Sequence, residues 1–170
     1  MEVVIAFSML GVLLLAFTYS YFLILKNHGY QNQRFDLRQT AIWALENISQ
    51  DLHQATSLTA ADVNALTFTL SSYETIAYAL ASAAGTTQLI RTYTLNTSPA
   101  TTKASAAAKN VSSFALAYYD SSGTELTSVP LSAGDMANVR LIKITLILQS
   151  TLSSNTQTWT LRTEVRPRNF

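Results

Sequence analysis

The sequence predicts an α+β protein, in which one long helix of about residues 1–54 packs its second half on an antiparallel β-sheet. Three observations predict this fold. The stretch Val3–Leu25 is uncharged and mostly apolar. From Lys26 onward apolar residues recur at three- and four-residue steps, and after Ala55 the period falls to two. We therefore divide the chain into a hydrophobic helical segment of residues 1–25, an amphipathic continuation of residues 26–54, and a β-sheet head of residues 55–170.

Composition narrows the possible chemistry. The chain has 170 residues, with Lys+Arg 11 against Asp+Glu 10, and this balance gives no electrostatic footprint for nucleic acid. Cysteine is absent, which excludes disulfides, thiolate metal sites and a Cys nucleophile. The two histidines, His28 and His53, fall on the predicted helix too far apart to share a site. We expect no enzyme activity, no cofactor and no metal ion.

The apolar segment Val3–Leu25 spans roughly 35 Å as a helix, enough to cross a bilayer core of about 30 Å. A cleaved signal peptide is disfavoured, because the run is long and is preceded by Glu2 rather than by Lys or Arg. Two other interpretations stay open. The segment is a plain membrane anchor, whose following basic residues would place the head in the cytoplasm, or it is a helix that waits in the membrane and later packs against copies of itself.

Glu2 bears on this choice. A carboxylate at the start of a helix is stabilised by the helix dipole. In a shared apolar core it would be costly unless a cation paired with it. The free amino terminus at Met1 of a neighbouring copy is such a cation, although Glu2 at a plain water interface needs no partner.

The second helical segment carries one apolar stripe, typical of a helix with a single buried face. No proline interrupts residues 1–54, and only Gly29 weakens the helix, by about 1 kcal/mol. Trp43 falls on the opposite side of the helical wheel, and Phe35 falls at one edge. We expect either that they contact another subunit or that Trp43 lies against the edge of the head. The stripe consists of Ala41, Ile42, Leu45, Ile48 and Leu52.

Alternating apolar residues in the head predict an antiparallel sheet with one solvated face. Hairpin turns are expected at Ser71–Glu74 and Ala83–Thr86. Small-residue composition predicts surface loops at Asn96–Asn110 and Asp120–Asn138. The predicted strands centre on Leu66–Leu70, Ile76–Leu80, Leu89–Leu95, Phe114–Tyr118, Leu141–Leu148 and Trp159–Arg166.

Few residues in the head suggest a chemical site. Asp120 and Asp135 flank a loop whose oxygens could bind Ca²⁺, but the spacing is not that of an EF-hand, and solvated turns are the favoured interpretation. The N-x-[ST] pattern marks Asn96 and Asn110 as exposed candidates for glycosylation, whereas Asn47 falls on the helix.

The amino terminus, Met1-Glu2-Val3-Val4-Ile5-Ala6 followed by Gly11, resembles the mature start of type IV pilins and type II secretion pseudopilins. In that family a glutamate lies four residues after the first residue, and a glycine commonly follows it at the interval that separates Glu2 from Gly11. Since Glu2 here follows Met1 directly, we expect three residues before Met1 or a different processing. More weakly, the order of Tyr118–Gly123, Val139–Ile144 and the closing Arg-Pro-Arg-Asn is similar to J-type pseudopilins and W-type minor pilins.

This resemblance implies a structural subunit of a type IV pilus-like filament, a helical homo-oligomer joined through its amino-terminal helices. It implies assembly roles for Met1, Glu2, Gly11, Phe35 and Trp43. It also implies a prepilin peptidase and methylation of the first residue, an inner-membrane platform, and a separate assembly ATPase. The subunit would lie in the inner membrane before assembly and at the cell surface afterwards, as part of a fimbrium.

Two alternatives stay open beside this hypothesis. One is a minor pseudopilin of a type II secretion-like system, with a role at the tip or in initiation. The other is a single-span, membrane-anchored binding module that acts as a monomer.

Overall fold

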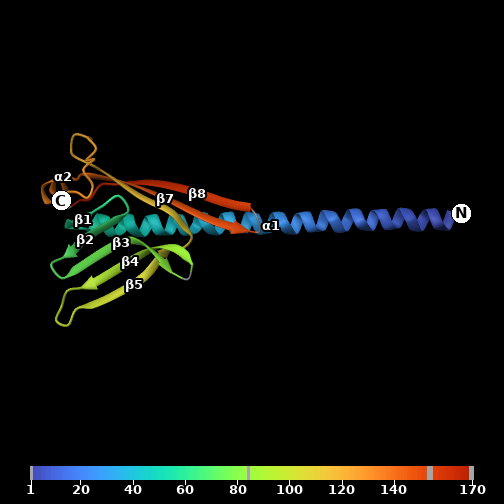
Figure 1. Ribbon diagram of the computed structural model, residues 1–170, viewed down its shortest axis with the longest axis horizontal. Helices are drawn as coiled ribbons and strands as arrows, with labels where there is room; N and C mark the ends of the chain where they lie inside the picture. The colour runs from blue at the N-terminus through green and yellow to red at the C-terminus, as the bar shows by residue number, and fades with distance from the viewer. Residues whose placement is uncertain (1, 84, 153–154, 169–170) are drawn as a thin grey trace. The chain divides into compact units, whose positions relative to one another are not determined.

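The computed structural model describes residues 2–83, 85–152 and 155–168 and confirms the predicted α+β fold. One long amino-terminal helix, α1 (Glu2–Gln54), precedes antiparallel strands and packs on them with its carboxyl-terminal half. The chain divides into two compact parts, Met1–Asp36 and Leu37–Phe170, which are taken separately below. The first part contains only the beginning of α1. The second part contains the rest of α1 and both sheets (Figure 1).

The helix α1 continues through the weak point at Gly29 and ends at Gln54. No proline removes an N–H donor before Gln54, so the hydrogen-bond ladder of the helix is not interrupted by a missing donor. At its end the N–H of Ala55 donates to the carbonyl of Leu52, at 3.2 Å, and closes the last turn. The chain then enters the first strand.

The larger sheet has five strands in the order β1-β2-β3-β4-β5, all joined as antiparallel neighbours. The predicted hairpin turns are confirmed, since Ser71 pairs with Glu74 and Ala83 pairs with Thr86. The strands are β1 (Ser57–Ala61), β2 (Ala65–Ser71), β3 (Glu74–Ala83), β4 (Thr86–Leu95) and β5 (Thr101–Ala108).

The smaller sheet has three strands in the order β6-β7-β8, with β6 (Val111–Tyr119), β7 (Leu141–Leu152) and β8 (Asn155–Val165). A short helix, α2 (Ala133–Asn138), lies between β6 and β7 in the chain and packs near β1. Its first turn is capped by the hydroxyl of Ser132, which accepts from the N–H of Asp135.

The core of the second part is a single apolar cluster between α1 and the two sheets. Ile48 and Leu52 of α1 are fully buried there, beside Phe68 and Tyr78, whose rings stack with their centroids 6.4 Å apart. In β2 and β6 buried residues alternate with more exposed ones, as the period of two predicted. The helix is thus fixed to the sheets by one face.

The structure differs from the sequence-based prediction in three elements. The predicted loop Asn96–Asn110 contains the edge strand β5, and the predicted loop Asp120–Asn138 contains α2. The strand β1 was not predicted, and the strands form two sheets rather than one. The strand β5 escaped prediction because it is built of Thr, Ala, Ser and Lys and has no apolar alternation. It is a strand because it pairs with β4. Periodicity also reveals strands but not their partners.

Candidate assembly surface

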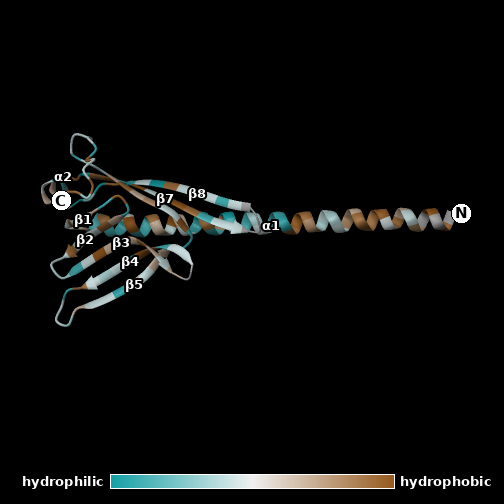
Figure 2. Cartoon of the chain, in the orientation of Figure 1, coloured by the Kyte–Doolittle hydropathy of each residue, from teal (hydrophilic) through white to brown (hydrophobic). Residues whose placement is uncertain are grey.

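The first part of α1 exposes nearly all of its apolar side chains. Leu15 and Phe17 are each 72% exposed. This is the one helix in the described residues that is long and apolar enough to cross a membrane; its apolar window has mean hydropathy 2.0 and no buried residue. Figure 2 shows the apolar character concentrated near the amino terminus. An exposed apolar surface of this extent is typical of segments that lipid or another protein covers.

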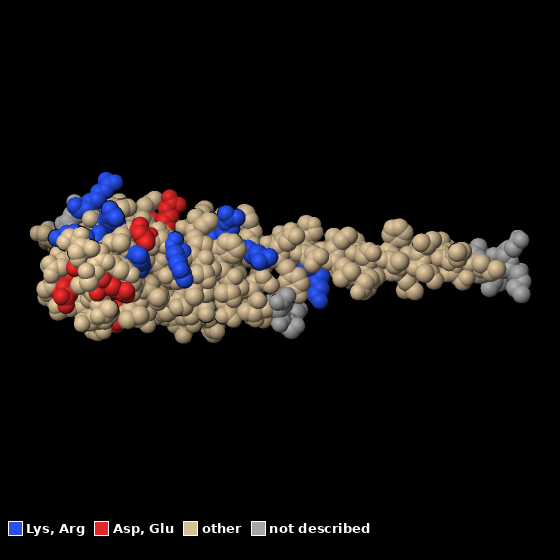
Figure 3. Space-filling view, turned by 90° about the horizontal axis from the view of Figure 1, so that it is seen from above, with Lys and Arg blue, Asp and Glu red and all other residues tan. Residues whose placement is uncertain are grey.

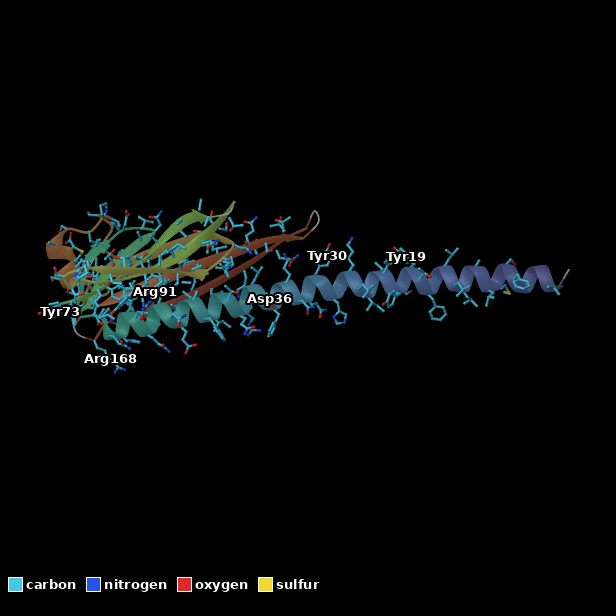
Figure 4. All side chains as sticks on the ribbon, turned by 90° about the horizontal axis from the view of Figure 1, so that it is seen from below. Tyr19, Tyr30, Asp36, Tyr73, Arg91 and Arg168 are labelled. Atoms are coloured by element: carbon cyan, nitrogen blue, oxygen red, sulfur yellow. The ribbon has the colours of Figure 1, made fainter. Side chains whose placement is uncertain are left out.

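Two hydroxyl side chains in this apolar segment are bound within the helix. The hydroxyl of Ser8 donates to the carbonyl of Ile5, and the hydroxyl of Thr18 donates to the carbonyl of Leu14, both at 2.8 Å. Hydroxyls bound in this way need no water, so they are compatible with an apolar environment. Tyr19 projects outward from the helix and is 68% exposed (Figure 4).

Gly11 has no intrachain explanation. A Cβ built at this position meets no heavy atom within 4 Å, and the backbone there is helical. Glycine in a helix interior costs about 1 kcal/mol relative to alanine. The fold of a single chain therefore does not require a glycine at this position, and any steric reason for it must lie outside the chain.

Met1 lies outside the described residues, and the structure places Glu2 as the first residue of α1 without describing its side chain. The proposed pairing of Glu2 with a neighbouring amino terminus stays a prediction.

The two aromatic residues singled out from the sequence both remain exposed. Phe35, in the first part, is 65% exposed. Trp43, in the second part, is also 65% exposed, and it borders a shallow hollow together with Gln39, Thr40 and Ala107 of β5. Trp43 therefore lies beside the edge of the head and still presents most of its surface outward.

The apolar stripe of the second helical half is buried, with one correction. Ala41, Leu45, Ile48 and Leu52 lie in the core, but Ile42 is 39% exposed. It lines an open groove between α1 and β8, opposite Leu161. Ile42 therefore falls at the margin of the buried stripe.

Sequence reasoning missed a polar cluster that fixes the end of α1. The carboxylate of Asp51 accepts from the hydroxyl of Tyr78 at 2.6 Å and from Nε of Arg91 at 2.7 Å, with a second guanidinium contact at 3.2 Å. Burial, and then the bond to Asp51, raise the pKa of the Tyr78 phenol, and the same carboxylate raises the pKa of Arg91. Figure 4 shows Arg91 beside α1. Asp51 follows the buried Ile48 by three residues, so both fall on the same face of the helix. This spacing was the signal in the sequence that Asp51 faces the head.

The acidic residues considered for calcium have local structural roles. One oxygen of Asp120 accepts from the N–H and hydroxyl of Ser122 and from the N–H of Thr124, and these bonds lower the pKa of Asp120. Asp135 accepts from the hydroxyl of Ser132 at 2.7 Å. Across the described ranges, no group of three or more His, Asp or Glu side chains is arranged to hold a metal ion.

The two candidate glycosylation residues are both exposed. The amide of Asn96 donates to the hydroxyl of Thr75 at 3.1 Å, at the end of β4. Asn110 occupies the turn between β5 and β6 with φ 58°, a conformation that asparagine adopts more readily than most residues. Their modification stays a prediction.

No protein-family model matches this chain, and no curated protein matches it in sequence.

Proposed function

We propose that this chain is a structural subunit of a type IV pilus-like filament and that it polymerises through the apolar first part of α1. Before assembly the segment lies in a membrane. On assembly it exchanges lipid for the corresponding helices of neighbouring copies. Removal of apolar surface from water stabilises by about 25 cal/mol per Å². Both the membrane-inserted state and the assembled state keep the segment out of water.

The observation that carries this proposal is the contrast within one helix. The second half of α1 buries a single stripe, whereas the first half is apolar on all sides and none of its apolar window is buried. A helix that is hydrophobic all round belongs in a membrane or in the core of a larger assembly. A membrane anchor accounts for this surface as well, and the additional support for a filament comes from Glu2, Gly11 and the exposed aromatics.

Gly11 and the two aromatics have roles that a polymer would explain. Helices approach most closely where a residue is small, and Gly11 leaves open space beside α1. Phe35 and Trp43 would be covered by neighbouring copies rather than by solvent. In the same scheme Glu2 neutralises the amino terminus of a neighbour and sets the axial step between subunits.

The resemblance of the amino terminus to pilins supplies the proposed partners. A prepilin peptidase would process and methylate the first residue, and a membrane platform with its ATPase would supply the motive force. Mass spectrometry of the purified chain tests this directly, because methylation adds about 14 Da to the first residue.

The decisive experiment replaces the charge near the amino terminus. Glu2→Leu is expected to insert in the membrane normally and to abolish filaments in electron micrographs of sheared cell surfaces. Glu46→Leu is the matched control, since Glu46 is an exposed carboxylate on the second half of α1. Filaments of normal number and form from the Glu2→Leu variant would remove the proposed role of that residue.

The same micrographs separate the alternatives. Fibres composed mainly of this chain support the proposal, whereas its presence in trace amounts at fibre ends indicates a minor pseudopilin. Absence of fibres, with all of the chain in the membrane fraction, indicates a single-span anchored module.

A further inference from the structure

The charged residues of the second part are segregated by the topology of the smaller sheet. Both β6 and β8 run antiparallel to the central strand β7, so both end at the same end of the sheet, with Tyr119 opposite Leu141 and Val165 opposite Ile142. Their exits are separated by two strand spacings, about 10 Å. In Figure 3 acidic and basic side chains gather on different sides of that end of the molecule.

The side that follows β6 is acidic. Asp120 and Glu125 lie in the loop after β6, and Asp62 lies in the loop that contacts β6, where the carbonyl of Val63 accepts from the N–H of Leu116. We define the acidic side as Asp62, Asp120, Glu125 and Asp135.

Each of these carboxylates is bound only by neutral groups. Asp62 accepts from the N–H of Val63, and Glu125 has a long contact of 3.4 Å with the hydroxyl of Tyr119. Asp120 and Asp135 accept from the turn and cap donors given above. Within the described residues no Lys or Arg forms a salt bridge with any of the four. The neighbouring guanidinium of Arg140 instead donates to two backbone carbonyls.

The side that follows β8 is basic. Arg162, Arg166 and Arg168 are exposed on β8 and on the segment after it, and we define these three as the basic side. No carboxylate in the described part of the chain pairs with any of them. Glu164, which lies between Arg162 and Arg166 in β8, pairs instead with Lys143 of β7 at 3.3 Å. Arg168 projects outward at the end of the head (Figure 4).

The basic side also presents an open strand edge and the acidic side an exposed apolar residue. β8 is an edge strand that pairs with β7 without a bulge, and an unpaired edge of this kind is usually protected by charge or covered by a partner. On the other side Val63 is 51% exposed beside Asp62.

Symmetry decides which partner fits these two sides. A two-fold dimer would pair the acidic side of each copy with the basic side of the other, but it would close at two copies and could not extend a filament. A head-to-tail contact places the basic side of one copy against the acidic side of the next, and repetition of that contact forms an open helical array. We propose that the acidic and basic sides of the second part form such a contact between successive copies of this chain. This inference rests on the proposed filament, and it names the surface through which the heads join.

Two charge-reversal variants of the full-length chain test the contact. The first is Arg166→Glu with Arg168→Glu. The second is Glu125→Lys with Asp135→Lys, which keeps the cap from Ser132 because the N–H of residue 135 is retained. The matched control is Lys103→Glu with Lys109→Glu, which changes the net charge as the first variant does but lies at β5 and the turn after it. Circular dichroism verifies that every variant is folded.

The measurement is the critical concentration for filament formation after detergent removal, determined by sedimentation. Each reversed variant alone is expected to require about tenfold more chain than the unmodified protein, because like charges then face each other at every head contact. An equimolar mixture of the two variants is expected to assemble within about twofold of the unmodified protein, since alternating copies restore opposite charges at every contact. The control variant is expected to assemble normally.

Three outcomes would overturn the inference. They are unchanged assembly of either reversed variant alone, failure of the folded mixture to recover, and an equal loss in the control. If the basic variant instead loses binding to anionic vesicles while its assembly is unchanged, the arginines serve a lipid surface and the head contact is rejected. Filaments that form through the apolar helix in any of these cases leave the proposed function intact. If the unmodified chain forms none, the proposed function itself fails.

Discussion

The two halves of α1 share one backbone geometry and differ in what surrounds them. Residues 37–54 bury a narrow stripe, in which Ile48 and Leu52 have no exposed surface, and present polar groups elsewhere. In the first half, apolar side chains such as Leu15 and Phe17 are more than two-thirds exposed. The comparison teaches that helix formation and helix burial are separate questions: an uninterrupted sequence without proline forms the helix, and only side-chain pattern tells what covers it.

The largest expected effect comes from truncating leucine in each half. Leu52→Ala is expected to lower the free energy of unfolding of the second part by about 2–5 kcal/mol, because it leaves a cavity in the core. Leu15→Ala, at a residue that is 72% exposed, is expected to change it by less than about 0.5 kcal/mol. Urea unfolding of both variants in the same detergent measures the difference. An equal loss in Leu15→Ala would contradict the exposure of that side chain.

A smaller effect is expected at the polar cluster that fixes the end of α1. Tyr78→Phe removes the phenol that donates to Asp51 and is expected to cost about 1–2 kcal/mol at neutral pH. Burial raises the pKa of Tyr78 above its unfolded value of 10.0 and so keeps the phenol protonated in the folded state. The resulting stabilisation is fully present below pH 10.0 and is lost as the pH rises above that value. Tyr118 behaves in the same way, because burial also raises its pKa.

Unfolding at pH 8 and pH 11 checks the sign of this dependence. The stability of the Tyr78→Phe variant should fall less steeply with alkali than that of the unmodified protein, without becoming flat. A steeper fall in the variant would contradict the assignment.

The smallest effect on folding is expected at Trp43. Trp43→Ala should change the stability of the second part by less than about 0.5 kcal/mol, because most of the side chain is already exposed. Its effect should appear in assembly, as a higher critical concentration for filaments. The control is Trp159→Ala, since that half-buried ring lies under Arg38, at 5.9 Å, and packs against the core. A Trp43 variant that destabilises the fold as much as the control would place Trp43 within the head's own packing.

Much of this fold could be predicted from the sequence, because its strongest signals are local. The helix follows from hydropathy and the absence of proline, and β3 and β8 follow from strict alternation. The elements that escaped prediction depend on neighbours distant in the chain. β5 is a strand because β4 lies beside it, and Asp51 is a structural residue because Tyr78 and Arg91 meet it from two strands.

The candidate assembly surface also has features that the sequence predicts and features that it does not. The exposure of Phe35 and Trp43 was expected from their places on the helical wheel, and the structure has both exposed. The opposed acidic and basic sides could not be predicted from the sequence, because they depend on the order β6-β7-β8 and on the loop of Asp62 reaching β6. Charges that are far apart in the chain become neighbours only once strand order is known.

The carboxylate of Asp51 has a consequence for strand register. Tyr78 on β3 and Arg91 on β4 stand directly opposite each other, and both donate to that one group. Slippage of either strand by a single residue would turn its donor to the other face of the sheet. Asp51 therefore fixes the register of β3 and β4. Without it, a long hairpin of small and polar residues such as Ala77, Ala79 and Thr92 would have little to select one alignment.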